Sequence, residues 1–234
     1  MDNKYIKAFK AAFPKTIPIF AGFTFLGISY GMFANSQGFN VWYSLLMSSL
    51  IFAGSVEFLT IGFLLDVFQP LTVLLMTLVV NFRHFFYGIS MLEKFKETGL
   101  KKYYLIFGMC DETFSINYTA KIPEDVDQGW FLFFVTLLNQ CYWVTGAVLG
   151  SLLGASMDGE FVGMEFVMTA LFIVLFLESF LNEKEHFSSY LGLGVSALSL
   201  LIFGQANFLL PALLSIAGII LLREHVSQRE GASR

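Results

Sequence analysis

Eight long apolar stretches, separated by short links with polar or charged residues, form the dominant pattern of this 234-residue chain. The stretches cover residues 17–34, 41–65, 70–91, 103–120, 130–153, 162–181, 187–204 and 206–222. A helix that crosses a bilayer needs about 20 largely apolar residues, and each stretch is close to that length. The runs are continuously apolar and do not alternate, which excludes a transmembrane β-barrel. The pattern predicts an all-α fold, a polytopic membrane helix bundle that forms one integral membrane domain over residues 1–234.

The composition agrees with this fold class, because 56% of the residues are hydrophobic and only 14% are charged. A soluble chain carries about 25% charged residues, so this chain lacks the polar side chains to cover a water-exposed surface. A soluble enzyme, a nucleic-acid-binding protein and a disordered chain are therefore excluded. Cys110 and Cys141 lie in apolar stretches, where isolated cysteines behave as small hydrophobic residues, and we expect neither a disulfide nor a metal site.

The positive charges predict the orientation of the chain, because cytoplasmic loops of membrane proteins are rich in Lys and Arg. Such residues precede the first stretch and follow the last: Lys4, Lys7, Lys10, Lys15, Arg223, Arg229 and Arg234. Both termini are expected in the cytoplasm, beneath the inner (plasma) membrane, which requires an even number of crossings. With eight crossings, the lysine-rich link from Lys94 to Lys102 would face outward. In the alternative, stretches 17–34 and 103–120 are re-entrant or broken, which leaves six crossings and returns this link to the inside.

A weak internal similarity bears on the same question. A shift of 88 residues aligns Trp42 with Trp130 and Gly62 with Gly150. The repeat units would be residues 17–91 and 103–181, followed by helices in 187–222, although chance similarity is an equal alternative in so apolar a chain. Three segments per unit would make the units inverted. Inverted repeats with broken helices are a recurring plan of secondary transporters.

The segment AGSVEF at residues 53–58 places a carboxyl group inside the second stretch. A charge at the bilayer centre costs at least about 2.5–3.5 kcal/mol, so it requires a reason. Gly54 and Ser55 permit a helix break that would offer backbone N–H groups to a substrate carboxylate, and Glu57 would accept from a substrate ammonium. In the alternative, Gly54 and Ser55 only allow close packing, and Glu57 pairs with Arg83.

Two further polar segments lie in the third and fourth stretches. Asn81 is expected to line a site, because it is neutral. Arg83 could clamp a carboxylate or extend to the membrane surface, and His84 could relay protons or be structural. Asp111 and Glu112 are neighbours and point about 100° apart on a helix, so one is expected to face an internal cavity and carry a proton. The alternative places both acids in an aqueous loop.

Glycines recur at every fourth position in two of the stretches. Gly146, Gly150 and Gly154 form one smooth stripe, and Gly27 with Gly31 repeats the spacing. Such stripes let helices approach closely, so helix packing is the expected role of these five glycines.

The sequence contains no metalloprotease, serine hydrolase or nucleotide-binding motif, and no loop is long enough for a nucleotide-binding domain. We therefore expect no enzymatic activity and no cofactor. Transport without hydrolysis is the simplest interpretation of polar groups inside a helix bundle.

Five segments, taken in order, resemble the AzlC family, the large subunits of branched-chain amino acid exporters of the YgaZ and BrnF type. They are AGSVEF at 53–58, NFRHFFYG at 81–88, CDETF at 110–114, WVTGAVLGSLLG at 143–154 and MEFVMTALFIVL at 164–175. The resemblance implies a secondary exporter of leucine, isoleucine and valine, with methionine as a further candidate. It also implies a small AzlD-type membrane subunit as partner. Glu57 departs from the family, which usually has glutamine there, so a transporter of another small solute stays an alternative.

Together these observations predict an alternating-access transporter that holds an amino acid substrate within the lipid bilayer. The expected substrate-binding residues are Gly54, Ser55, Glu57 and Asn81, and the expected coupling network is Arg83, His84, Asp111 and Glu112. A non-transporting membrane scaffold or assembly protein remains an alternative of another class.

Overall fold

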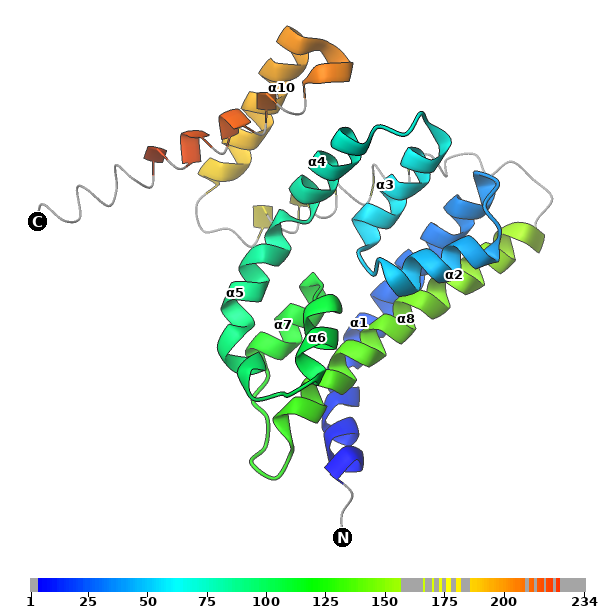
Figure 1. Ribbon diagram of the computed structural model, residues 1–234, viewed down its shortest axis with the longest axis vertical. Helices are drawn as coiled ribbons and strands as arrows, with labels where there is room; N and C mark the ends of the chain where they lie inside the picture. Colours follow the sequence, from blue (N-terminus) through cyan, green and yellow to red (C-terminus); the bar gives the residue numbers. More distant parts are fainter. Residues whose placement is uncertain are drawn as a thin grey trace, which may run out of the picture. The chain divides into compact units, whose positions relative to one another are not determined.

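The computed structural model describes residues 4–156 and 186–208, together with 166, 170, 173, 176, 177, 180, 181, 211, 212, 214–216, 218–220, 222 and 223. Within these residues the regular secondary structure is entirely helical, as predicted (Figure 1). The chain divides into two compact units, residues 1–169 and 170–234, and each is described by itself.

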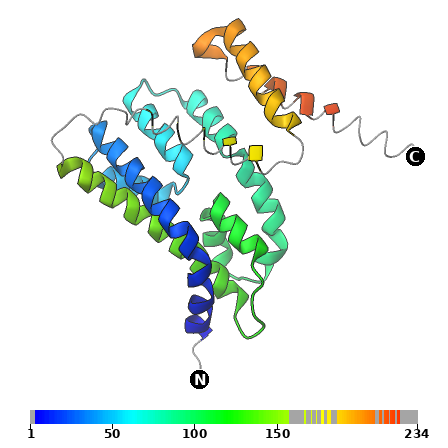
Figure 2. The same cartoon turned by 180° about the vertical axis from the view of Figure 1, so that it is seen from behind.

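The first unit contains two long parallel helices that pack against each other along most of their length. α1 (Lys4–Ser36) and α8 (Gln128–Ser156) contain 33 and 29 residues, and both are long and apolar enough to cross a membrane. They lie side by side and run in the same direction (Figures 1 and 2). Aromatic pairs mark the contact, with ring centroids 4.6 Å apart for Tyr5 and Trp130 and 5.0 Å apart for Phe20 and Tyr142. The alternative of a broken first stretch does not hold, since α1 is continuous through residues 17–34.

The glycine stripes lie in this contact and allow the backbones of α1 and α8 to approach each other closely. A Cβ atom added to Gly27 would lie 2.8 Å from the carbonyl oxygen of Trp143, and one added to Gly146 would lie 2.7 Å from that of Thr24. At Gly31 and Gly150 an added Cβ would overlap with the backbone of the opposite helix.

Gly154 continues the contact at the far end, where a Cβ would lie 3.0 Å from the side chain of Asn35. The two backbones therefore approach as closely as small-residue stripes allow.

The stretch 41–65, predicted as one crossing, is instead a helical hairpin. α2 (Val41–Leu50) and α3 (Gly54–Leu65) are separated by a break in which Phe52 has φ +46°, in the left-handed region. The chain reverses direction at this break (Figure 1). The break has a local cause, because the Glu57 side chain accepts the Ala53 N–H at 3.2 Å and so starts a new helix.

The stretch 103–120 forms a second hairpin, which agrees with the re-entrant alternative. α6 (Lys101–Phe107) and α7 (Asp111–Thr119) are joined by a turn at residues 108–110 (Figure 1), and each contacts α8. Gly108 stands at the break, where a Cβ atom would overlap with the Thr136 side chain of α8.

The stretch 70–91 is a bent helix pair that continues to Lys96. α4 (Pro70–Val80) and α5 (Phe82–Lys96) meet at Asn81 with a bend of 50°, and together they are long and apolar enough to span a membrane. The first unit therefore contains three interrupted helix pairs beside two continuous helices.

The lysine-rich link between α5 and α6 lies at the same end of the first unit as the N-terminus. Lys7 of α1 forms an ion pair with Asp125 at 3.2 Å, just before α8 begins. The Lys101 ammonium lies 4.6 Å from the ring centroid of Trp130, the same ring that contacts Tyr5. One end of the unit thus carries both groups of lysines. The link at residues 94–102 and the N-terminus can therefore lie on the same side of the membrane, and this link need not face outward as the eight-crossing prediction required.

In the second unit, α10 (Phe187–Asn207) contains an apolar segment, Phe187–Gly204, that is long enough to cross a membrane, and Gly204 has φ +69°. The predicted stretch 162–181 lies largely outside the described residues, and 206–222 lies partly outside them. Among the described helices three are long enough to span alone, or four with α4–α5, so eight crossings are not confirmed. Nor is the inverted repeat, because the 88-residue shift aligns the break at 51–53 with residues 139–141 of the continuous α8.

Candidate functional site

The three interrupted helix pairs share a cavity of about 270 Å³. Its lining comes from all three breaks: Ile51, Phe52 and Ala53 of the first hairpin, Asn81, His84 and Gly88 around the α4–α5 bend, and Ile106, Phe107 and Met109 of the second hairpin. The two hairpin tips meet here, with the rings of Phe52 and Phe107 6.5 Å apart. Interrupted helices at membrane depth are tolerated where they line a cavity, and the three breaks described here line one.

The polar lining of the cavity comes from the α4–α5 bend. Asn81 ends α4 with φ −92° and ψ 6°, and its carbonyl oxygen lies 3.2 Å from Nδ1 of His84. The same carbonyl accepts the backbone N–H of His84 at 2.9 Å. The structure therefore places two predicted site residues, Asn81 and His84, on the wall of a cavity whose other side chains are aromatic or aliphatic.

Beside this wall, Arg83 and Asp111 form an ion pair. Their Nη1 and Oδ2 atoms are 2.5 Å apart, and the side chains are 37% and 29% exposed. The pair joins the first turn of α5 to the first turn of α7. Nε of Arg83 and Oδ1 of Asp111 are buried, and neither atom has a hydrogen-bond partner among the described residues. The alternative in which Glu57 pairs with Arg83 is therefore wrong.

Glu112 follows Asp111 in the first turn of α7 and is partly buried. Carboxylates at this position are favoured by the partial positive charge of a helix N-terminus. The alternative of an aqueous loop is wrong, because both acids belong to a helix.

Glu57 lies outside the cavity, in the contact between α3 and α8. It is completely buried, and its two carboxylate oxygens each accept the indole N–H of Trp143 at 3.0 Å. Gly54 packs on the same indole, since an added Cβ would lie 2.9 Å from the Trp143 ring, and Ser55 is buried beside it. Of the four residues predicted to bind substrate, Asn81 lines the cavity, and the other three do not.

Two further side chains on α8 hold the hairpins, and neither was predicted from the sequence. Asn139 donates to the hydroxyl of Thr113 in α7 at 3.1 Å. Gln140 accepts from the hydroxyl of Tyr104 in α6 at 2.6 Å and donates to the carbonyl of Ser49 in α2 at 3.0 Å.

Asn139, Gln140 and Trp143, here called the α8 hub, therefore connect one turn of α8 to all four hairpin helices. The available signal was three hydrogen-bonding side chains within five positions of an apolar stretch. None of the three side chains is charged, so burying them costs less free energy than burying an ionised group. The sequence pattern that marked Glu57 and Asp111 therefore does not mark these three.

The described residues contain no group of three or more His, Cys, Asp or Glu side chains that could hold a metal ion. Cys110 contacts the hydroxyl of Thr113 at 3.1 Å. The residues that line the cavity offer hydrogen bonds from Asn81 and His84 and apolar contacts from the others.

Comparison with known proteins gives a consistent result. The family model described as AzlC protein matches residues 18–157, which include the cavity and the α8 hub. A Bacillus subtilis protein named branched-chain amino acid transport protein AzlC is 56% identical over 95% of this chain and 88% of its own length. An uncharacterized membrane protein of Haemophilus influenzae is 49% identical, over 95% of this chain and 91% of its own. The Escherichia coli inner membrane protein YgaZ is 24% identical over 72% of each chain. No solved structure matches the chain.

Proposed function

Because this chain belongs to the AzlC family, we propose that it is a secondary transporter that exports branched-chain amino acids across the cytoplasmic membrane. The substrates are leucine, isoleucine and valine, with methionine as a further candidate. The name of the Bacillus subtilis relative, a branched-chain amino acid transport protein, supports this substrate class.

The observation that carries the proposal is the cavity at the three helix breaks. Interrupted helices that meet around a site near mid-membrane are the plan of many secondary transporters. Ile51, Phe107 and Met109 offer an apolar surface that suits an aliphatic side chain, whereas Asn81 and His84 offer polar groups to the amino acid backbone. A small amphipathic solute with one apolar and one polar end matches this lining.

The neighbouring ion pair supplies groups for a zwitterion. Within the described part of the chain, one carboxylate oxygen of Asp111 and the Nε–H of Arg83 have no hydrogen-bond partner. A substrate ammonium can approach the first and a substrate carboxylate the second, while the ion pair itself opens or rearranges. Arg83 and Asp111 are therefore proposed as the charged part of the binding site.

The fold supports alternating access with the α1–α8 pair as the static part. The close glycine contact makes this pair rigid, whereas the α4–α5 bend and the hairpin tips contribute the cavity wall. By the positive-inside rule, the lysines at the N-terminal end support a cytoplasmic location for that end. We place the C-terminus in the cytoplasm as well, and an AzlD-type small subunit completes the exporter.

Efflux of labelled leucine from preloaded cells tests the proposal. Cells that produce the chain with an AzlD-type subunit should lose leucine faster than cells with the empty vector. A panel with valine, methionine, lysine and a small organic acid defines the substrate class. Leucine efflux equal to that of the vector control would remove the substrate assignment, and efflux of another panel member alone would replace it.

A further inference from the structure

Glu57 is a buried acid that the proposed binding site does not use. Its side chain is completely inaccessible to solvent, and no Lys, Arg or His among the described residues forms an ion pair with it. An isolated charge in an apolar interior is unfavourable unless the group is neutralised. A carboxyl group can be neutralised in such a place by binding a proton.

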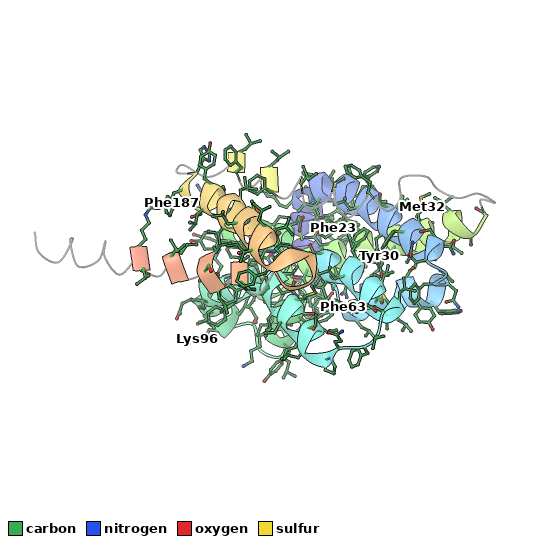
Figure 3. The ribbon with its side chains drawn as sticks, turned by 90° about the horizontal axis from the view of Figure 1, so that it is seen from above. Phe23, Tyr30, Met32, Phe63, Lys96 and Phe187 are labelled. Atoms are coloured by element: carbon green, nitrogen blue, oxygen red, sulfur yellow. The ribbon has the colours of Figure 1, made fainter. Side chains whose placement is uncertain are left out.

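The neighbours of Glu57 keep its surroundings uncharged. Tyr30 of α1 (labelled in Figure 3) is near Glu57, and its hydroxyl donates to the sulfur of Met47 in α2 at 3.1 Å. The Tyr30 ring contacts those of Phe58 and Trp143, with centroids 5.3 and 6.1 Å away. Tyr30, a titratable side chain near Glu57, is itself completely buried. The described neighbours therefore provide no fixed positive charge.

The hydrogen bonds of Glu57 also support the ionised form. Trp143 can only donate, and its indole N–H is shared between both carboxylate oxygens; the Ala53 N–H adds a third contact at 3.2 Å. The first turn of α3 adds the partial positive charge of a helix N-terminus. Dipoles thus stabilise the carboxylate without cancelling its charge, which leaves both protonation states accessible.

We propose that Glu57 is the proton-binding site that couples amino acid movement to the proton gradient. This inference rests on the proposed transport function and assigns its coupling ion and the residue that carries it. The step is the reversible addition of one proton to one Glu57 carboxylate oxygen, with no other bond made or broken.

Ala53 connects this proton site to the substrate cavity. Its N–H binds Glu57, and the residue itself lines the cavity next to Phe52, whose backbone is in the left-handed region. A protonated oxygen becomes a donor and can no longer accept fully from Trp143. Proton binding therefore weakens the contacts that fix the break at residues 51–53, and the cavity wall changes with it. In the conformation described, the site is closed to solvent, as coupling requires in an occluded state.

Transport by the full chain and its small subunit in proteoliposomes tests the coupling. Glu57→Gln keeps the side-chain size and one acceptor but cannot bind a proton, and Glu93→Gln, at an exposed acid of α5, is the matched control. We expect wild type and Glu93→Gln to accumulate leucine when a pH gradient is imposed. Glu57→Gln should accumulate at least about tenfold less leucine than wild type but should retain leucine–leucine exchange. Accumulation by Glu57→Gln at the wild-type level would overturn the inference. A wild type that exchanges leucine but does not respond to the gradient would also overturn it.

A second measurement does not depend on transport. Infrared difference spectra of the purified chain, recorded as the pH is lowered, should show the carbonyl band of a buried protonated carboxylic acid. The band should vanish in Glu57→Gln and persist in Glu93→Gln. Persistence of the band in Glu57→Gln would assign the proton to another acid and overturn the inference. Absence of leucine transport by the wild type, with this band present, would instead count against the proposed transport function and leave proton binding by Glu57 supported.

Discussion

Trp143 of α8 donates its indole N–H to both carboxylate oxygens of Glu57, at 3.0 Å each, and so ties a continuous helix to the first turn of a hairpin helix. One turn away, Asn139 and Gln140 hold the other hairpin helices. The α8 hub therefore fixes the two hairpins whose tips form much of the cavity wall. Predictions about stability and transport follow from these contacts.

Trp143→Phe should destabilise the protein, because it leaves a buried carboxyl group without its side-chain donor. The expected loss is about 1–3 kcal/mol in the free energy of unfolding, read as a lower thermal unfolding temperature in detergent. Trp130→Phe, at a ring that packs on Tyr5, is the control and should have a smaller effect. Adding Glu57→Leu to Trp143→Phe should recover part of the loss, since both buried polar partners are then removed. A double variant less stable than either single one would contradict the assignment.

Asp111→Asn should lower leucine efflux about tenfold or more, because a charge-assisted hydrogen bond contributes roughly 1.5–3 kcal/mol. The control is Asp125→Asn, which removes an exposed ion pair with Lys7, and such pairs contribute about 0–1 kcal/mol. Initial efflux rates at equal protein level give the comparison. Equal rates for both variants would show that the Arg83–Asp111 pair does not participate in transport.

Gly31→Leu should prevent assembly of the α1–α8 pair, because even a Cβ atom at this position would overlap with the backbone of Ala147. Gly22 lies on the same helix, and a Cβ there would meet no atom within 4 Å, so Gly22→Leu is the matched control. The yield of monodisperse protein after detergent extraction should fall sharply for the first variant only. Normal yield of Gly31→Leu would mean that α1 and α8 do not pack as described.

Gln140→Leu should slow transport several-fold, since one side chain links α2 and α6 to α8. Two partly buried hydrogen bonds are lost, each with a net contribution of about 1 kcal/mol. Tyr104→Phe removes one of the two and should have the smaller effect. The substrate concentration for half-maximal efflux should rise if the cavity wall shifts. An effect of Tyr104→Phe equal to that of Gln140→Leu would place the whole contribution in the α6 contact.

Membrane-impermeant thiol labelling should reach Lys96→Cys and Lys10→Cys from the same side of the membrane. The measurement requires a background in which Cys110 and Cys141 are replaced by alanine. Both sites lie toward one end of the first unit, which we place in the cytoplasm. Labelling of the two sites from opposite sides would contradict a single lysine-rich end and restore the eight-crossing arrangement of this region.

Several elements of the first unit could be predicted from sequence, because they depend on local chemistry. The all-helical class followed from continuous apolar runs, and the position of Asn81 at the cavity followed from a neutral polar group within one of them. The hairpin α2–α3 could not be predicted in this way. An apolar stretch of 25 residues is equally compatible with a crossing and with two short helices that fold back, and the choice depends on contacts with α8.

The partner of Glu57 was missed for a related reason. From the sequence, Glu57 was expected to meet a substrate ammonium or, in the alternative, Arg83, and both of these partners are charged. Burial in an apolar contact instead favours donors that carry no charge, here an indole and a backbone N–H. In the sequence, Trp143 is one of many hydrophobic residues in its stretch. A single sequence does not show that its indole N–H donates a hydrogen bond to an acid far away in the chain.

The parallel pairing of α1 and α8 has a consequence for biogenesis. α1 leaves the ribosome first, yet the helix that receives its glycine face begins only at Gln128. Until that helix enters the bilayer, both hairpins lack the side chains that fix them, and α1 presents an unmatched face to lipid. The bundle therefore closes late in synthesis, and a chain interrupted before α8 would leave its earlier segments inserted without a partner and exposed to quality-control proteolysis.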